Sequence, residues 1–226
     1  DVSYGNGTGG PALNTTVHAV GDPIAYHVPS EDIGNSWQTP AFNDDLWTAA
    51  HSAVGWGYND SVGDAIAADG DLTVPMRGTN ASVYLRLPFQ IDDPAGVNGL
   101  VLKTKVDDGF VAYLNGFEVA SKNKPGVLSF DSSTDPGVRE EVEVDDQFEV
   151  SILNFAGRLE TGENILALHG LNDSAGSSDF ILIPELVAEI QSTAPLAEPA
   201  YLTTPTPDST NGIPSFAPPE KVEFDV

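Results

Sequence analysis

The side chains best suited to hold a cation are the acidic ones that follow Tyr58. Four carboxylates occur within twelve residues, and no Lys or Arg lies among them: Asp60, Asp64, Asp69 and Asp71. Carboxylate oxygens are hard ligands of the kind that calcium prefers, and crowding them without a cation is repulsive. These residues therefore predict a calcium site. A solvated acidic loop is the alternative, because the chain carries many other acidic residues.

A second pair of carboxylates, Asp107 and Asp108, precedes Gly109. We count both Asp residues among the predicted calcium ligands. The alternative is a turn in which one Asp accepts hydrogen bonds from backbone amides and the Gly adopts a positive φ. Short turns of this kind are the commoner use of Asp at such positions.

Aromatic side chains beside polar ones are the residue types that bind sugars. An aromatic face stacks on the apolar side of a pyranose, and a few polar groups fix its orientation. Trp56 and Tyr58 are flanked by glycines and lead into the acidic loop, which favours an exposed platform. We predict a carbohydrate site formed by Trp37, Trp56, Tyr58 and Asn59. The alternative places these rings in the core, because Trp is highly buried on average.

The residue patterns of common catalytic sites are missing from the sequence. The 4 His residues are scattered without H-x-H or H-E-x-x-H spacing, and the absence of Cys removes thiolate zinc sites and cysteine nucleophiles. No G-x-S-x-G, P-loop or dinucleotide-binding string occurs. Adjacent acidic residues point to opposite faces of a strand, so they do not form a glycosidase pair by themselves. We therefore expect a protein that is not an enzyme.

The charge balance excludes two classes of partner. The chain has 9 Lys and Arg against 34 Asp and Glu, which gives a net charge of −25. Nucleic-acid binding depends on clustered basic residues, and anionic lipid attracts the same residues, so neither is an expected partner. No apolar run reaches the roughly 18 residues of a membrane span, so we expect no membrane insertion.

Short alternating segments predict the fold. Residues 83–91 place Val83, Leu85, Leu87, Phe89 and Ile91 on one face. Asn115-Gly116 lies between apolar runs and predicts a hairpin. Further strands are predicted at 99–106, 139–144, 148–153, 164–171 and 180–190. No segment keeps a helical period over three turns, so the chain is predicted to be an all-β, antiparallel two-sheet sandwich.

Composition divides the chain into three parts. Residues 1–22 are rich in Gly, Asn and Thr and are expected to form an arm or an edge strand. Residues 23–191 hold the predicted sandwich. Residues 192–226 contain seven Pro, which predicts an extended linker or a docked tail, because Pro cannot join a central sheet.

Several strings in this order resemble those of galactose-binding-like jelly-roll domains. They are W-Q-T-P-A-F-N-D-D-L-W (37–47), G-W-G-Y (55–58), Y-L-R (84–86), D-D-G-F-V-A-Y-L-N-G-F-E-V (107–119), G-E-N-I-L-A-L-H (162–169) and S-S-D-F (177–180). The resemblance covers residues 24–190. It implies a jelly-roll fold and the setting of an accessory domain in a large secreted bacterial multidomain protein. It does not transfer a ligand, because one fold hosts many functions.

Together these features predict a non-catalytic carbohydrate-binding module with structural calcium, secreted or at the cell surface. The expected partners are an extracellular or cell-wall polysaccharide and the neighbouring modules of a parent protein. The alternative is a structural or adhesive spacer domain with no glycan site.

Overall fold

The structure, a computed structural model, describes residues 12–59, 62–135, 149–191, 201–202 and 214–215. Residues 12–190 form one compact unit, and the remainder of the chain forms a second. In the second unit, β12 (Tyr201–Leu202) pairs with β13 (Pro214–Ser215). The predicted strand at 139–144 lies outside the described residues.

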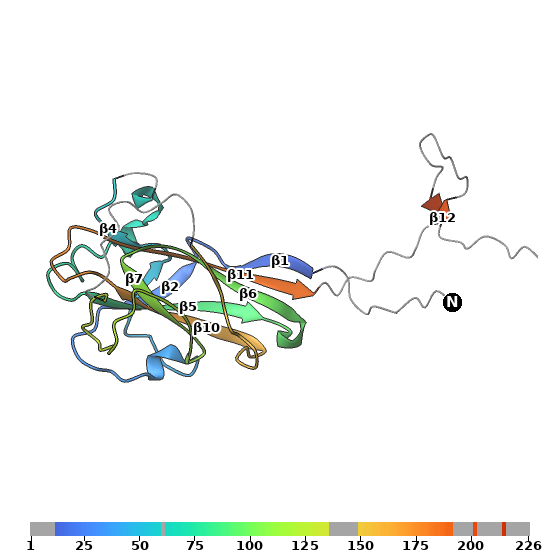
Figure 1. The fold of residues 1–226 in the computed structure, drawn as a ribbon, viewed down its shortest axis with the longest axis horizontal. Helices are drawn as coiled ribbons and strands as arrows, with labels where there is room; N and C mark the ends of the chain where they lie inside the picture. Colours follow the sequence, from blue (N-terminus) through green and yellow to red (C-terminus); the bar gives the residue numbers. More distant parts are fainter. Residues whose placement is uncertain (1–11, 60–61, 136–148, 192–200, 203–213, 216–226) are drawn as a thin grey trace, which may run out of the picture. The chain divides into compact units, whose positions relative to one another are not determined.

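The first unit is a sandwich of two antiparallel sheets, which confirms the predicted fold class (Figure 1). The five-stranded sheet has the order β1-β11-β6-β9, with β4 also paired to β11. Its strands are β1 (Ala12–His18), β4 (Val54–Trp56), β6 (Val97–Asp107), β9 (Glu149–Ile152) and β11 (Phe180–Gln191).

The six-stranded sheet has the order β3-β2-β5-β10-β7-β8. Its strands are β2 (Pro23–His27), β3 (Thr48–His51), β5 (Ser82–Ile91), β7 (Gly109–Leu114), β8 (Phe117–Lys122) and β10 (Gly162–Leu171). Short 3₁₀ turns interrupt the loops: η1 (Ser36–Gln38), η2 (Gly63–Ala65), η3 (Ala68–Gly70) and η4 (Pro94–Gly96).

The main core lies between the sheets, where the alternation predicts it. The five alternate apolar residues of β5, from Val83 to Ile91, all belong to this core. The predicted hairpin is also confirmed: Asn115 and Gly116 join β7 to β8 with φ values of 49° and 90°. Both values are positive, as the favoured hairpin turns require.

A second apolar cluster covers the outer face of the six-stranded sheet. Its fully buried members are Trp37, Tyr84, Val111, Tyr113, Ile165, Ala167 and Leu171. Tyr84 therefore lies on the face of β5 opposite the main core, yet it exposes only 4% of its surface. The loop between β2 and β3, residues 28–47, provides Trp37 and covers this face.

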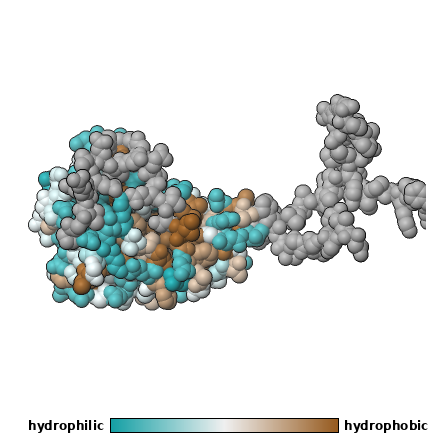
Figure 2. All heavy atoms as spheres, viewed as in Figure 1, coloured by the Kyte–Doolittle hydropathy of each residue, from teal (hydrophilic) through white to brown (hydrophobic). Residues whose placement is uncertain are grey.

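The surface mixes polar residues with some exposed apolar side chains, among them Leu46, Val74 and Ile152. On the face shown in Figure 2, hydrophilic residues gather at one end of the described surface, and a patch of hydrophobic residues lies beside them. Among the described residues, no helix is long and apolar enough to cross a membrane.

Candidate functional site

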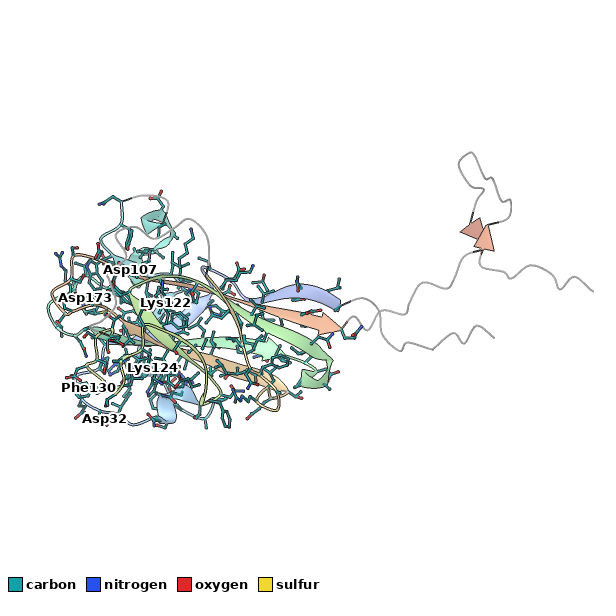
Figure 3. All side chains as sticks on the ribbon, viewed as in Figure 1. Asp32, Asp107, Lys122, Lys124, Phe130 and Asp173 are labelled. Atoms are coloured by element: carbon teal, nitrogen blue, oxygen red, sulfur yellow. The ribbon has the colours of Figure 1, made fainter. Side chains whose placement is uncertain are left out.

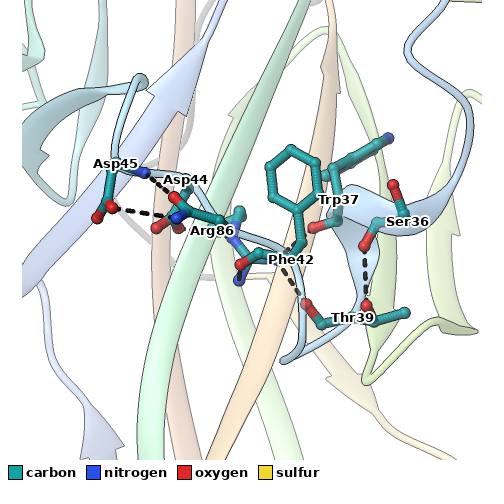
Figure 4. A network of polar contacts seen from close by, with 8 residues as sticks. Ser36, Trp37, Thr39, Phe42, Asp44, Asp45 and Arg86 are labelled. Carbon is teal, nitrogen blue, oxygen red and sulfur yellow. Dashed lines mark hydrogen bonds and ion pairs between the residues drawn. The ribbon is translucent and has the colours of Figure 1, made fainter.

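Arg86 of β5 holds the β2–β3 loop against the outer face of the sheet (Figure 4). Its Nε donates to Asp44 Oδ2 at 2.6 Å, and its Nη2 donates to the Phe42 carbonyl at 3.4 Å. Its Nη1 donates to the carbonyls of Trp37 and Thr39. The guanidinium also lies 5.4 Å from the centre of the Phe42 ring. One buried arginine thus fixes the loop that carries Trp37.

The loop places Trp37 on an aromatic group that stands on the sheet. Trp37 stacks on Tyr84 with ring centres 4.1 Å apart and planes 10° from parallel. The Tyr113 ring meets Trp37 edge-on at 6.0 Å, and the His169 ring meets Tyr84 edge-on at 4.7 Å. Stacked and edge-on pairs at these distances are favourable and rigid.

A pocket of about 300 Å³ opens beside this group. The β2–β3 loop contributes Asp32, Gly34, Asn35, Trp37 and Gln38 to its wall. Tyr84, Tyr113 and His169 rise from the sheet, and Leu128, Ser129 and Phe130 close the wall from the loop after β8. Figure 3 labels Asp32 and Phe130 at one end of the sandwich. A volume of this size suits a small ligand.

Two phenols, those of Tyr84 and Tyr113, line the pocket, and neither hydroxyl oxygen is among the buried side-chain atoms that lack a partner in the described residues. Tyr84 and Tyr113 expose only 4% and 8% of their surfaces. Burial, with a contribution from the Asp32 charge, raises the pKa of Tyr84, and burial raises the pKa of Tyr113 to about 12. Both hydroxyls therefore stay protonated at neutral pH and can donate to a ligand.

His169 is a neutral acceptor in the same wall. Its Nε2 lies 2.7 Å from Ser82 Oγ, and that hydroxyl donates its own hydrogen to the Ser132 carbonyl at 2.7 Å. Nε2 must therefore carry the proton in this pair, which leaves Nδ1 as an acceptor. Burial lowers the pKa of His169 to about 3, so the ring is uncharged at neutral pH.

The pocket combines donors and acceptors on an aromatic wall. Tyr84 and Tyr113 donate, His169 accepts, and the side-chain amides of Asn35 and Gln38 can do both. Asp32 is the only carboxylate among the residues that line it, all of which the structure describes. Glycosidic hydrolysis uses a pair of carboxylates. This arrangement suits binding of hydroxyl groups.

The predicted platform at Trp56 is wrong. Trp56 exposes 5% of its surface and packs on Phe180 within the main core. Its flanking glycines allow close strand packing instead of exposure. A Cβ at Gly55 would lie 2.2 Å from the Phe180 carbonyl oxygen, and one at Gly57 would lie 2.6 Å from Asp179 Cβ.

The four predicted carbohydrate residues lie in different places. Trp37 lines the pocket. Tyr58 is half-buried and donates to Asp107 Oδ2 at 2.6 Å, and Asn59 is exposed. The structure thus separates Trp37 from Trp56, which belong to different apolar clusters.

The acidic loop does not gather its carboxylates into a site within the described residues. Asp69 pairs with His51 at 2.6 Å, and Asp71 Oδ1 accepts from the Thr73 amide at 2.8 Å. Asp64 is exposed, and Asp60 lies outside the described residues. No group of three Asp, Glu, His or Cys side chains that could hold a metal occurs in the part of the chain that the structure describes. The hydrogen bond from His51, at the end of strand β3, holds Asp69 away from the other carboxylates, and the local sequence does not reveal this contact.

Asp107 and Asp108 are both buried, with 1% and 4% of their surfaces exposed. The alternative prediction for this pair is a turn in which Gly109 adopts a positive φ. That part is wrong, because Gly109 has no positive φ and begins strand β7. The Asp108 carboxylate accepts from the amide of Asp173, far away in the sequence. Burial first, and contact with Asp108 second, raise the pKa of Asp107 to about 8.

No protein-family model matches the sequence, and no curated protein matches it. Three solved structures that are similar to the chain come from bacterial enzymes. A Bacteroides uniformis β-glucuronidase is 14% identical over 78% of this chain and 18% of its own, with a TM-score of 0.46. A β-glucuronidase from an uncultured Clostridium sp. is 10% identical over 80% of this chain and 29% of its own, with a TM-score of 0.45. An Amycolatopsis orientalis exo-chitosanase is 15% identical over 78% of this chain and 20% of its own, with a TM-score of 0.48. This chain spans less than a third of each of these proteins.

Proposed function

We propose that this protein is a non-catalytic carbohydrate-binding module, and that its sugar site is the pocket beside Trp37. The observation that carries the proposal is the wall of this pocket, where the protonated phenols of Tyr84 and Tyr113 stand beside Trp37 and the uncharged ring of His169. A phenol that donates to an oxygen of the ligand contributes about 0.5–1.5 kcal/mol to binding.

The chemistry of the wall selects a neutral polyhydroxyl compound. Sugar hydroxyls both donate and accept, and they can match the phenols, the amide side chains and His169 together. Asp32 at the wall and the net charge of −25 repel anions. Neutral galactosyl, glucosyl or mannosyl polymers of an extracellular matrix or cell wall are therefore the expected partners, and the protein would act outside the cell beside other modules of a parent chain.

Removing the two hydroxyls tests the site with little change to the fold. Tyr84→Phe and Tyr113→Phe should each weaken binding of the preferred neutral oligosaccharide roughly fivefold, because each loses one hydrogen bond of about 1 kcal/mol. Affinity of the unaltered site should be weak, on the order of 0.1–1 mM. A glycan array identifies the ligand, and isothermal titration calorimetry measures the change.

Tyr26→Phe is the matched control, because Tyr26 is equally buried at 8% but belongs to the main core. It should bind sugar like the unaltered protein. The stability of the two pocket variants should change little, since Phe keeps the ring and removes only the hydroxyl. No glycan bound on the array, or equal affinity in all four proteins, would leave the spacer function as the better account.

A further inference from the structure

The carboxylates of Asp107 and Asp108 form a buried pair that the sugar pocket does not use. They sit at the junction of β6 and β7, and neither lines the pocket. The ion pairs of Arg86, Lys103 and Lys124 are made with Asp44, Glu185 and Glu118, not with this pair. Burial of a charged carboxylate is costly, and two carboxylates in contact repel each other, so either a proton or a bound cation must relieve the pair.

One oxygen of each carboxylate accepts a hydrogen bond, and the other oxygen accepts none within the described residues. Tyr58 Oη donates to Asp107 Oδ2 at 2.6 Å, and the Asp173 amide donates to Asp108 Oδ2 at 2.6 Å. The Oδ1 atoms of both residues are buried and have no partner among the described residues. Carboxylates that bind metals are commonly oriented by hydrogen bonds in this way.

We propose that the Oδ1 atoms of Asp107 and Asp108 bind a hard divalent cation. Oxygen ligands of this kind suit calcium and magnesium. Calcium is the better candidate because it accepts roughly six to eight oxygens in irregular geometry, so backbone carbonyls and water can complete the shell. Magnesium is often held by only one or two carboxylates, and the experiment must separate the two ions.

Such a cation would fasten three segments that are distant in the sequence. Tyr58 comes from the loop after β4, the carboxylates come from the β6–β7 junction, and Asp173 comes from the loop between β10 and β11. Figure 3 shows Asp107 and Asp173 near one another at one end of the sandwich. The nearby charge of Asp179 adds to the repulsion at Asp107. A cation bound only by the folded state would therefore stabilise it.

Thermal unfolding of the full chain tests this proposal. Millimolar CaCl₂ should raise the melting temperature by about 5 °C more than NaCl of equal ionic strength, because a specific ion stabilises beyond screening. A parallel MgCl₂ series assigns the ion by the larger shift. Equal shifts in all three salts would overturn the proposal.

Two variants locate the site. Asp108→Asn should remove the divalent-specific shift, and the exposed control Asp64→Asn, from the acidic loop, should keep it. The proposal would be overturned if the melting temperature of Asp108→Asn rose with the divalent cation as much as that of the unaltered protein. It would also be overturned if only Asp64→Asn lost this rise.

Terbium luminescence gives a measurement that needs no folded Asp108 variant. Terbium replaces calcium at oxygen sites and is sensitised by a nearby phenol, and Tyr58 contacts Asp107 directly. We expect one calcium-displaceable terbium per chain, with weaker emission in Tyr58→Phe. Absence of displaceable emission would contradict the site. Because Asp107 and Asp108 do not line the sugar pocket, this failure would leave the carbohydrate proposal untouched.

Discussion

Replacing Arg86 by Ala is expected to lower the free energy of unfolding by about 3 kcal/mol and to abolish sugar binding. The Arg86 side chain is 3% exposed, and its loss leaves Asp44 and several loop carbonyls without their donor. The loop that carries Trp37 would then detach from the sheet, and the pocket would lose one wall. Urea denaturation measures the stability, and calorimetric titration with the sugar measures binding.

Arg77→Ala is the control, because Arg77 is exposed. It should change stability by less than about 0.5 kcal/mol. The free energy of unfolding of Arg86→Lys should lie between those of Arg86→Ala and Arg77→Ala. Lys keeps the charge but cannot reach several acceptors at once. If Arg86→Ala were as stable as Arg77→Ala, the loop would not depend on this contact, and the account of the pocket wall would fail.

Lowering the pH from 6.5 should remove a contribution of His169 to stability, while the raised pKa of Asp107 acts in the opposite direction over the same range. The pKa of this His is lowered from 6.5 to about 3 by burial, so the unfolded state binds the proton more readily than the folded state. Stability from this group is complete above 6.5 and declines at about 1.4 kcal/mol per pH unit between 6.5 and 3. Measurement by urea denaturation from pH 7 to pH 5 stays above the pI of about 4.1.

His169→Gln separates this effect from the titration of carboxylates. Gln can still donate to Ser82 but does not titrate, so the variant should lose less stability over the same pH range. The difference between the two proteins should be about 2 kcal/mol at pH 5 relative to pH 7. Parallel pH curves for the two proteins would show that His169 does not resist protonation in the folded state.

The sheets could be predicted from the sequence because their signal is local. In β5, each apolar residue from Val83 to Ile91 faces the main core, and the intervening positions lie on the other face. The Asn115-Gly116 turn fixes the β7–β8 hairpin through its own backbone preference. Neither feature depends on contacts made far away in the chain.

The site could not be predicted in the same way, because distant segments create it. The alternation of apolar residues places Tyr84 on the outer face of the sheet, where a side chain is usually exposed to solvent. Only the covering loop makes that position part of a pocket wall. The sequence around Tyr113 and His169 likewise contains no signal of a ligand. One sequence signal could have indicated the covered face: a loop with two Trp precedes a strand with the pattern Tyr-x-Arg. In the structure, the Arg of this pattern binds that loop.

The error at Trp56 has a similar origin. Glycines beside an aromatic residue fit either an exposed loop or a close approach of two strands. The contact of Gly55 with the backbone of Phe180 decides between these, and it joins residues far apart in the sequence.

The central claim, that the sugar site is the pocket beside Trp37, is tested most directly by NMR. The chain has 3 Trp, whose indole N–H signals can be assigned by single Trp→Phe substitutions. Titration with the neutral oligosaccharide chosen by the glycan array should shift the Trp37 signal and leave that of core-buried Trp56 unchanged. A shift at Trp56 with none at Trp37, or no shift in either, would contradict the account.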